Sequence, residues 1–198
     1  MPESESEENE YGDLWIVKFE KLKEHTFLER IPDHFLEDRF NLVNLKEQVD
    51  DFPELHRAIL DQGPSMDFES ECKLYLIIHR RYILFNKNGL NEVFSKVKNK
   101  FYGVCSKYGC KEGAMIPVGL SNDFGRAKTK LYCNSCKDIY EPRGYLKKLD
   151  GSAWGTTLCP YLLVADPKFF DQVNTKTFKP RLFGFDVEPL DVSSDSSN

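Results

Sequence analysis

Residues 105–110, Cys-Ser-Lys-Tyr-Gly-Cys, and residues 133–136, Cys-Asn-Ser-Cys, decide how the second half of this chain folds. They hold four of its six cysteines as two close pairs, separated by an insert at 111–132. Two short cysteine-bearing turns can each offer two sulfur ligands to one tetrahedral ion, and both spacings are typical of structural zinc sites. We therefore predict that one Zn²⁺ is bound by Cys105, Cys110, Cys133 and Cys136.

Two other states of these cysteines are compatible with the spacing: a pair of disulfides, or four ordinary core cysteines. We favour metal. The chain has no histidine beyond His79, so the ligands would be sulfur alone. A four-thiolate site leaves no open position for water, which makes the zinc structural rather than catalytic. Its binding would contribute on the order of 10 kcal/mol to folding of this segment.

The composition indicates a chain with a packed core. Of its 198 residues, 40% are hydrophobic and 13% are aromatic, which suits one large domain or two small ones. Neither end carries an apolar run flanked by basic residues, and the most apolar stretch, Leu74 to Phe85, is interrupted by His79-Arg80-Arg81. We expect no secretory signal and no membrane partner, but an intracellular protein, whose thiols stay reduced.

Charge is unevenly distributed along the chain. Residues 1–100 carry 14 Lys and Arg against 21 Asp and Glu, residues 101–181 carry 13 against 7, and residues 182–198 carry none against 4. The zinc half is therefore basic, and both ends are acidic. This is either ordinary surface variation or a basic face that meets an acidic partner, or the acidic ends of the same chain.

The first hundred residues show helical periodicity, strongest from Asp67 to Phe85. His79 and Cys72 lie on the apolar face of that segment, and we interpret both as core residues. The predicted helices are a short one around 14–22, a pattern that opens at Asp33, one from Asp50-Asp51-Pro53 to Leu60 that Gly63-Pro64 breaks, one from Asp67 to Phe85 that Asn88-Gly89 ends, and one from Leu90 to about Lys100.

After Phe101, glycine and proline separate short β-prone runs, which predicts a small antiparallel zinc ribbon. The runs are 115–118, 130–132, 138–140 and 161–164. The last belongs to an almost continuous apolar stretch, Leu158 to Val164, which either lies in the core or faces a partner. Cys159 within that stretch has no pair spacing, so we leave it out of the metal site.

Residues 180–187, Pro-Arg-Leu-Phe-Gly-Phe-Asp-Val, alternate like a late strand with Phe183, Phe185 and Val187 on one face. Such a strand is either the last core strand or a hydrophobic contact edge, and the residues alone favour the core. The predicted fold class is α+β. Its parts are an acidic disordered tail at 1–12, a helical subdomain at 13–100, a zinc-ribbon subdomain at 101–180, and a strand with an acidic tail at 181–198.

A series of short motifs runs through most of residues 35–187: RFNL at 39–42, RYIL at 81–84 with Asn88-Gly89, MIPVGLS at 115–121, KLYC at 130–133, CKDIY at 136–140, WGT at 154–156 and PRLFGF at 180–185. Together, in this order and with this cysteine spacing, they resemble the regulatory (beta) subunit family of casein kinase II. The resemblance implies a non-catalytic chain with a helical part and a zinc ribbon. Two copies would pair through their ribbons and carry two catalytic alpha subunits in an α2β2 assembly that acts on protein substrates.

The resemblance also assigns roles to residues. The positions between the two ribbons are Tyr108, Leu120, Ile139 and Tyr140. The positions of the kinase-docking hairpin are Tyr161, Leu163, Arg181, Leu182, Phe183 and Phe185. The candidates for autophosphorylation of the acidic N-terminus are Ser4 and Ser6. Family members often carry a dense acidic loop, and the corresponding stretch keeps only Asp61, Asp67, Glu69 and Glu71.

Two other classes of function compete with a regulatory scaffold. A nucleic-acid-binding zinc ribbon is favoured by Arg126-Lys128-Lys130 and by Lys147-Lys148 near Tyr145, but the acidic ends would repel phosphate. An enzyme is disfavoured, since the sequence offers no phosphate-cradling glycine loop, no open metal site and no Cys–His arrangement near the metal.

Overall fold

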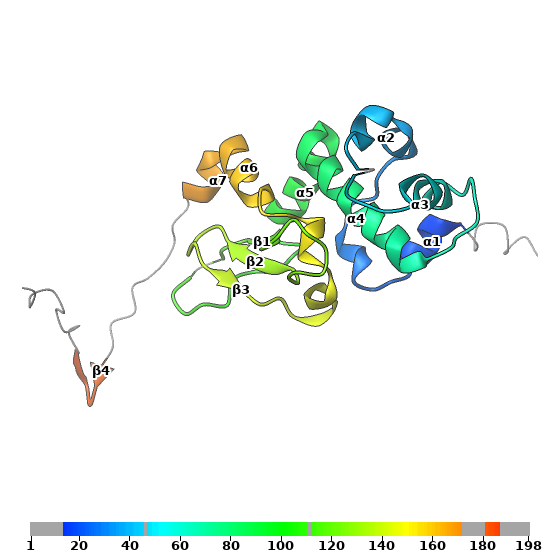
Figure 1. Ribbon diagram of the computed structural model, residues 1–198. Helices are drawn as coiled ribbons and strands as arrows, with labels where there is room; N and C mark the ends of the chain where they lie inside the picture. Colours follow the sequence, from blue (N-terminus) through cyan, green and yellow to red (C-terminus); the bar gives the residue numbers. More distant parts are fainter. Residues whose placement is uncertain (1–13, 46, 111, 172–180, 187–198) are drawn as a thin grey trace, which may run out of the picture.

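The computed structural model describes residues 14–45, 47–110, 112–171 and 181–186 (Figure 1). Helices come first, a three-stranded antiparallel sheet follows, and two short helices and a hairpin end the described chain. The predicted α+β class is confirmed. None of the described helices is both long and apolar enough to cross a membrane.

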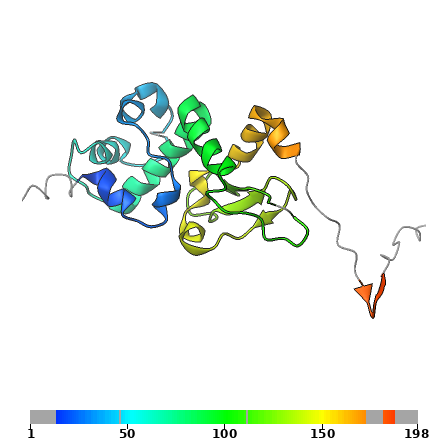
Figure 2. The ribbon, with the colours of Figure 1, turned by 180° about the vertical axis from the view of Figure 1, so that it is seen from behind.

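The helical part is built around α4 (Phe68–Phe85), whose Asp67 side chain accepts a hydrogen bond from the Glu69 N–H and caps its first turn. The other elements of this part are α1 (Trp15–Glu20), η1 (His25–Phe27), α2 (Asp33–Glu37), η2 (Arg39–Leu42), α3 (Phe52–Ile59) and α5 (Lys87–Lys98). These elements lie near the predicted positions, although Asp51 has a left-handed backbone and gives α3 no side-chain cap. The helices occupy one end of the molecule in both views (Figures 1 and 2).

The junction of α4 and α5 differs from the prediction. Asn86 both ends α4 and caps α5 by accepting from Asn88 N–H, so Asn88-Gly89 opens the second helix instead of ending the first. A Cβ at Gly89 would lie 2.7 Å from the Tyr82 carbonyl oxygen. Glycine is therefore required for close packing of α5 on α4 and not for a helix end.

The ribbon sheet has the order β1 (Met115–Val118), β2 (Lys130–Cys133) and β3 (Ile139–Tyr140). The register pairs Met115 with Cys133, so the sheet's zinc end lies where β1 begins and β2 ends. These strands match three of the four predicted β-prone runs. Two turns, η3 (Gly144–Lys148) and η4 (Gly151–Ala153), follow the sheet.

His79 joins the two halves. It is fully buried in α4, accepts from the Glu29 N–H at Nε2 (3.0 Å) and donates from Nδ1 to the Ala153 carbonyl in η4 (3.1 Å). Its ring also meets the buried Trp154 edge to face. The prediction of a satisfied core histidine is confirmed, and the same residue ties the helices to the ribbon.

The fourth β-prone run was predicted wrongly. Residues 158–165 form the helix α6 (Leu158–Ala165), followed by α7 (Pro167–Asp171). Leu158 and Leu162, four residues apart, are buried on one side, while Tyr161 and Leu163 are exposed. Helical packing of the i, i+4 pair has overridden the β propensity of the run. The stretch was expected either to lie in the core or to face a partner. The helix has one face in the core and one face exposed.

The core strand that the residues alone favoured at 180–187 is wrong, and a hairpin, as the family resemblance implied, takes its place. Residues 181–186 form a hairpin of β4 (Arg181–Leu182) and β5 (Phe185–Asp186), with Leu182 opposite Phe185. Its two turn residues, Phe183 and Gly184, have φ of 51° and 89°. Two positive φ values in a two-residue loop define a type I′ turn, which fits a right-twisted hairpin. The aromatic side chains are exposed, so this segment is not a core strand.

Candidate metal centre

The Sγ atoms of Cys105, Cys110, Cys133 and Cys136 lie within 4.8 Å of one another. Cys105 and Cys136 are 3.7 Å apart at sulfur, and so are Cys110 and Cys133. With Zn–S bonds of about 2.3 Å, a tetrahedral site separates its sulfurs by about 3.8 Å. The size of the cluster and its all-sulfur donor set therefore fit a structural zinc ion. Within the described chain, no other group of three or more potential ligands is brought together.

Each cysteine pair is shaped by a turn with a left-handed residue. Gly109 (φ 79°) precedes Cys110, and Lys137 (φ 59°) follows Cys136. The Cys136 N–H points to Cys133 Sγ at 3.4 Å, which places a backbone dipole toward the sulfur. Such N–H groups stabilise thiolate charge, so the turns orient the ligands and also favour their ionised form.

Gly113 is a site residue that the cysteine spacing did not reveal. A Cβ at this position would lie 2.4 Å from Cys133 Sγ and 3.1 Å from Cys110 Sγ. Its carbonyl accepts from the Cys105 N–H at 2.8 Å. The backbone at 113 thus passes directly beside two sulfurs from opposite pairs, and only glycine fits there. Nothing in the local sequence marks it, because the close approach comes from the pairing of β1 with β2.

Asn134, between the second pair of cysteines, connects the second cysteine turn to the rest of the fold by hydrogen bonds. Its side-chain oxygen accepts from the Ala114 N–H at 2.8 Å, and its Nδ2 donates to the Phe169 carbonyl at 2.9 Å. Lys137 Nζ donates to the carbonyls of Asn134 and Phe170. Helix α7 therefore closes over the second cysteine turn, a tertiary contact that the sequence did not predict.

The sulfur environments differ from one another. Burial raises the pKa of Cys133 and of Cys105. Burial acts in the same direction on Cys136, but hydrogen bonds from Tyr140 and the neighbouring thiols outweigh it and lower the pKa of Cys136. The Tyr140 hydroxyl lies 3.1 Å from Cys136 Sγ. A hydroxyl donor at a sulfur is a common second contact of metal-bound cysteine.

The two remaining cysteines take no part in the cluster. Cys72 is half-buried against the helical core, and burial raises the pKa of its thiol to about 12. Cys159 is half-buried in α6, and burial raises the pKa of its thiol to about 11. Both thiols are therefore kept neutral, as expected for structural rather than reactive cysteines.

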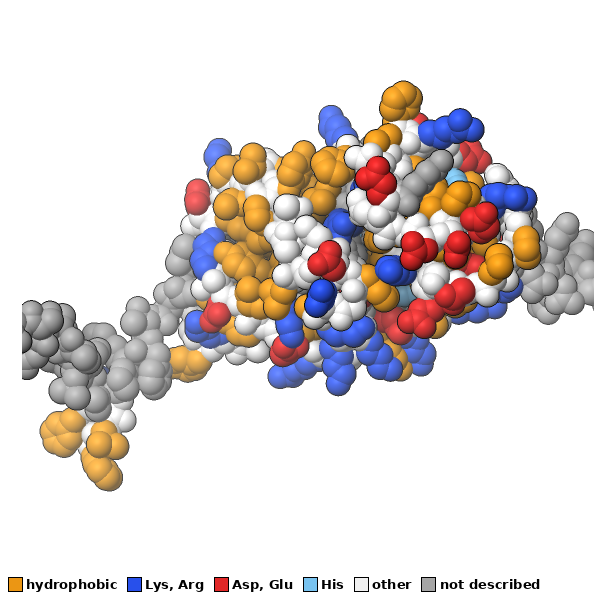
Figure 3. Space-filling model, in the orientation of Figure 1, with side chains coloured by type: hydrophobic (Ala, Val, Ile, Leu, Met, Phe, Trp, Pro, Cys, Tyr) orange, Lys and Arg blue, Asp and Glu red, His pale blue; other side chains and the backbone are white. Residues whose placement is uncertain are grey.

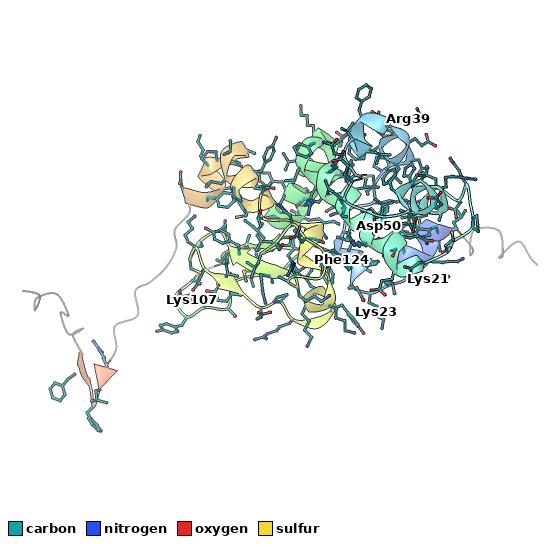
Figure 4. The ribbon with its side chains drawn as sticks, viewed as in Figure 1. Lys21, Lys23, Arg39, Asp50, Lys107 and Phe124 are labelled. Atoms are coloured by element: carbon teal, nitrogen blue, oxygen red, sulfur yellow. The ribbon has the colours of Figure 1, made fainter. Side chains whose placement is uncertain are left out.

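The residues expected between two ribbons lie around the sheet. Tyr108 (80% exposed) lies in the first cysteine turn, and Ile139 begins β3. The ion pair between Lys107 and Asp138, at 3.2 Å, brings these two segments side by side. Figure 4 shows Lys107 at the outer tip of the ribbon. Leu120, also exposed, follows the end of β1 that points away from the cysteines. Tyr140 is half-buried with its hydroxyl at Cys136, so it has a role at the metal centre besides the expected one.

The residues expected to dock a kinase fall on two different elements. Arg181, Leu182, Phe183 and Phe185 belong to the β4–β5 hairpin, but Tyr161 and Leu163 belong to helix α6. The expectation that all six form one hairpin is therefore wrong. The candidate phosphorylation sites Ser4 and Ser6 lie outside the described residues.

The acidic stretch at 61–71 is largely used within the fold. Asp61 accepts from the Trp15 N–H, and Asp67 caps α4. Glu71 is fully buried and accepts from the Trp15 indole (2.7 Å) and the Ser65 hydroxyl (2.8 Å). Only the fourth acid, Glu69, is exposed without such a structural bond. This stretch therefore stabilises the start of α4 more than it presents charge.

The comparisons with known proteins agree with this architecture. The model of the family described as casein kinase II regulatory subunit matches residues 14–186. "Casein kinase II subunit beta" of Schizosaccharomyces pombe is 34% identical over 194 residues, covering 93% of this chain and 82% of that protein. "Casein kinase II subunit beta'" of Saccharomyces cerevisiae is 32% identical over 200 residues, covering 94% and 77%. "Suppressor-of-stellate-like protein" of Drosophila melanogaster is 30% identical over 176 residues, covering 87% and 78%.

A family match over most of the chain, with relatives above 30% identity and four clustered cysteines, leads to one assignment. The chain belongs to the casein kinase II regulatory subunit family, and it is a regulatory rather than a catalytic chain.

Proposed function

We propose that this chain is the regulatory scaffold of a Ser/Thr protein kinase assembly of cytoplasm and nucleus. It binds one structural zinc ion per chain, dimerises through its zinc ribbon and docks two catalytic alpha subunits. Docking modulates the stability, activity and substrate choice of the kinase. Chemistry stays with the catalytic subunit, and this chain contributes rigid geometry and contact surfaces.

The observation that carries the docking proposal is the exposed apolar surface of the β4–β5 hairpin. Phe183 is 92% exposed, Phe185 is 78% exposed and Leu182 is 61% exposed. Three large apolar side chains on six residues are costly to leave in water, and aromatic anchors of this kind dominate binding energy at interfaces. A two-residue turn fixes the hairpin, which lowers the entropy cost of binding.

Phe183 supports this proposal by its backbone as well. A type I′ turn prefers Asn or Asp at its first central position, because a Cβ is strained at positive φ. A phenylalanine there costs about 1 kcal/mol, and strained residues are retained mainly where function requires them. The aromatic ring at the tip is best explained as an anchor for a partner.

The exposed side of α6 offers a second contact to the same partner or to another one. Tyr161, Leu163 and Val164 are exposed, while Leu158 and Leu162 hold the helix on the body. Because α6 is folded onto the core, it presents this surface without ordering cost. We assign it a supporting role, since its exposed residues are aliphatic apart from Tyr161.

Dimerisation is supported by the ribbon. Tyr108, Ile139 and Leu120 are exposed large apolar residues in or beside the ribbon sheet. A zinc ion cross-linking the two cysteine turns would hold Tyr108 and Ile139 in place, because both follow or precede a ligand within three residues. Loss of zinc is therefore expected to remove the dimer as well.

The decisive experiment compares two double variants of the full chain. Phe183→Ala with Phe185→Ala should abolish binding to a catalytic alpha subunit in calorimetry, at roughly 2 kcal/mol or more per anchor, and leave zinc content and dimer mass unchanged. Phe40→Ala with Phe85→Ala removes two equally exposed aromatics of the helical part and serves as the matched control. Equal affinity for both variants and wild type would show that the hairpin is not the docking element.

A further inference from the structure

Two lysines contact one exposed tyrosine where the helical part meets the ribbon. Lys23, which lies between α1 and η1, donates to the Tyr145 hydroxyl at 3.1 Å, and its Nζ is 5.1 Å from the ring centroid. The Nζ of Lys148 in η3 is 5.3 Å from the same centroid. We define the Tyr145 cluster as these two lysines and the exposed cations within two residues of Lys23 or Tyr145, namely Lys21, Arg143 and Lys147.

This cluster belongs to a basic face. Blue side chains gather along the lower surface of the molecule (Figure 3), where Figure 4 labels Lys21 and Lys23. All five side chains are exposed, and none of them forms an ion pair with a carboxylate of the described chain. Lys23 and Lys148 approach the same ring, where their like charges repel each other and a bound anion would reduce the cost.

The other candidate basic stretch is different. Lys128 pairs with Asp150 at 3.8 Å, and Lys130 pairs with Glu141. The stripe Arg126-Lys128-Lys130, which favoured nucleic acid in the sequence, is therefore partly neutralised. Arg143, Lys147 and Lys148, within three residues of Tyr145, form no ion pair within the described residues.

The chain carries a matching anion next to this surface. Residues 1–13 contain no lysine or arginine and six acids, which are Glu3, Glu5, Glu7, Glu8, Glu10 and Asp13. The segment enters α1 at Leu14, and α1 has six residues, so its entry point is about 10 Å from Lys21. Thirteen residues can span roughly 40 Å when extended. The segment is therefore long enough to reach every member of the cluster.

We propose that the acidic N-terminal segment, residues 3–13, binds the Tyr145 cluster of its own chain and keeps other polyanions away from it. Tethering gives the segment an effective concentration in the millimolar range, so even weak pairing occupies the surface. Phosphate on Ser4 or Ser6 would add close to two negative charges at each site and tighten the contact. This is a regulated electrostatic cover, which goes beyond the docking function proposed above.

Two other occupants are less favoured by the charges. The C-terminal residues 187–198 hold three acids, half as many as the N-terminal segment. Nucleic acid would meet a chain of net charge −5, with six of its acids tethered close to the binding surface. Both occupants are outcomes of the experiments below.

The first experiment tests the contact in the wild-type full chain. Carbodiimide joins a carboxylate to an amine only when they are in contact. Mass mapping should find Glu3 to Glu10 joined to Lys21, Lys23, Lys147 or Lys148, with the links lost in 0.5 M salt. Two results would overturn the proposal. One is crosslinks only to lysines outside the cluster, and the other is that the C-terminal acids Glu188, Asp191 and Asp195 are joined to the cluster instead.

The second experiment tests the cover by competition, with a labelled peptide of residues 2–13 as probe. A full chain with Glu3, Glu5, Glu7, Glu8 and Glu10 changed to Gln should bind the probe about tenfold more tightly than wild type, measured by anisotropy at low salt. Adding Lys23→Glu and Lys148→Glu should abolish this binding. Adding Lys87→Glu and Lys168→Glu, an equal change of charge at exposed lysines outside the cluster, should not.

Equal binding of the probe to wild type and to the Gln variant would refute the cover. So would a labelled 12-nucleotide single strand that binds wild type as tightly as the Gln variant, since the cluster would then be an open nucleic-acid surface. Zinc content of each variant confirms that the ribbon remains folded. The readout is peptide binding, so a failure of kinase docking would leave this result unaffected.

Discussion

At the scale of single residues, the metal centre depends on a missing side chain as much as on its sulfurs. Gly113 brings its backbone against the sulfurs of Cys110 and Cys133, which come from different turns. An added methyl group would have to displace one of them. A zinc–thiolate site tolerates little distortion. The added methyl group should therefore disturb the tetrahedral arrangement of the sulfurs more than it destabilises the strand.

Gly113→Ala is therefore expected to weaken zinc binding. Overpacking of this kind costs about 1–3 kcal/mol, which corresponds to a zinc dissociation constant larger by roughly 5-fold to 160-fold. Competition with a chromophoric chelator measures it. Gly63→Ala, where the new Cβ would meet Arg57 at an ordinary 3.5 Å, is the control and should leave zinc affinity unchanged. A wild-type zinc affinity in Gly113→Ala would mean that the cysteine turns yield without cost.

The four ligands could be predicted from the sequence because their spacing is local chemistry: each pair lies within one turn. Gly113 and Asn134 could not be predicted in the same way. Their roles depend on β1 lying beside β2 and on α7 closing over the second turn, and neither contact leaves a local pattern.

At the scale of elements, the two wrong predictions share a cause. The run at 161–164 is rich in β-prone residues, but Leu158 and Leu162 recur at a helical step and are buried together. The alternation of residues 180–187 indicated one strand, because Phe183 occupies a turn position usually held by Asn or Asp. Only the family resemblance implied the hairpin. In both segments, side-chain contacts outweigh the secondary-structure propensity of the residues. The contact is core packing for Leu158 and Leu162, and the proposed partner contact for Phe183.

Phe183→Asn separates the two roles of that residue. Asparagine suits the left-handed turn, so cross-strand proximity between Leu182 and Phe185 in NMR spectra should be kept or strengthened. Binding to a catalytic alpha subunit should nevertheless weaken roughly thirtyfold, since about 2 kcal/mol of anchor contact is lost. If binding is unchanged while the hairpin persists, the turn shape and not the aromatic ring is what the partner recognises.

At the scale of the whole molecule, the two halves are joined by polar contacts, of which those of His79 are buried, as well as by apolar packing. His79 links Glu29 of the helical part to Ala153 of the ribbon part, and Arg80 donates to the Asn122 and Ser152 carbonyls. The composition change near residue 101 indicated the two parts. The link between them could not be read from it, because residues 29, 79 and 153 are distant in sequence. Protonation of His79 should therefore loosen both halves together.

The pH dependence of unfolding tests this link. Burial lowers the pKa of His79 to about 3, with Lys96 and His25 adding to the effect, from an ordinary value of 6.5. The folded state thus resists a proton that the unfolded state accepts. The stability that the neutral His79 provides is fully present above pH 6.5 and is lost progressively as the pH falls toward 3. By pH 5 the loss of unfolding free energy is about 2 kcal/mol. Burial lowers the pKa of His25 too, whereas the raised pKa of Glu29 acts in the opposite direction.

His79→Asn isolates this term. The variant should be less stable at pH 7, but its unfolding free energy should fall less between pH 7 and pH 5 than that of wild type, by up to one proton's slope, about 1.4 kcal/mol per pH unit. Urea unfolding at matched zinc concentration measures both, and acid effects on the cysteines cancel in the comparison. The exposed His34→Asn is the control and should keep the wild-type slope. If the unfolding free energy of His79→Asn depends on pH as steeply as that of wild type, the acid sensitivity comes from other groups. If the variant destabilises only the helical part or only the ribbon part, His79 does not couple the two.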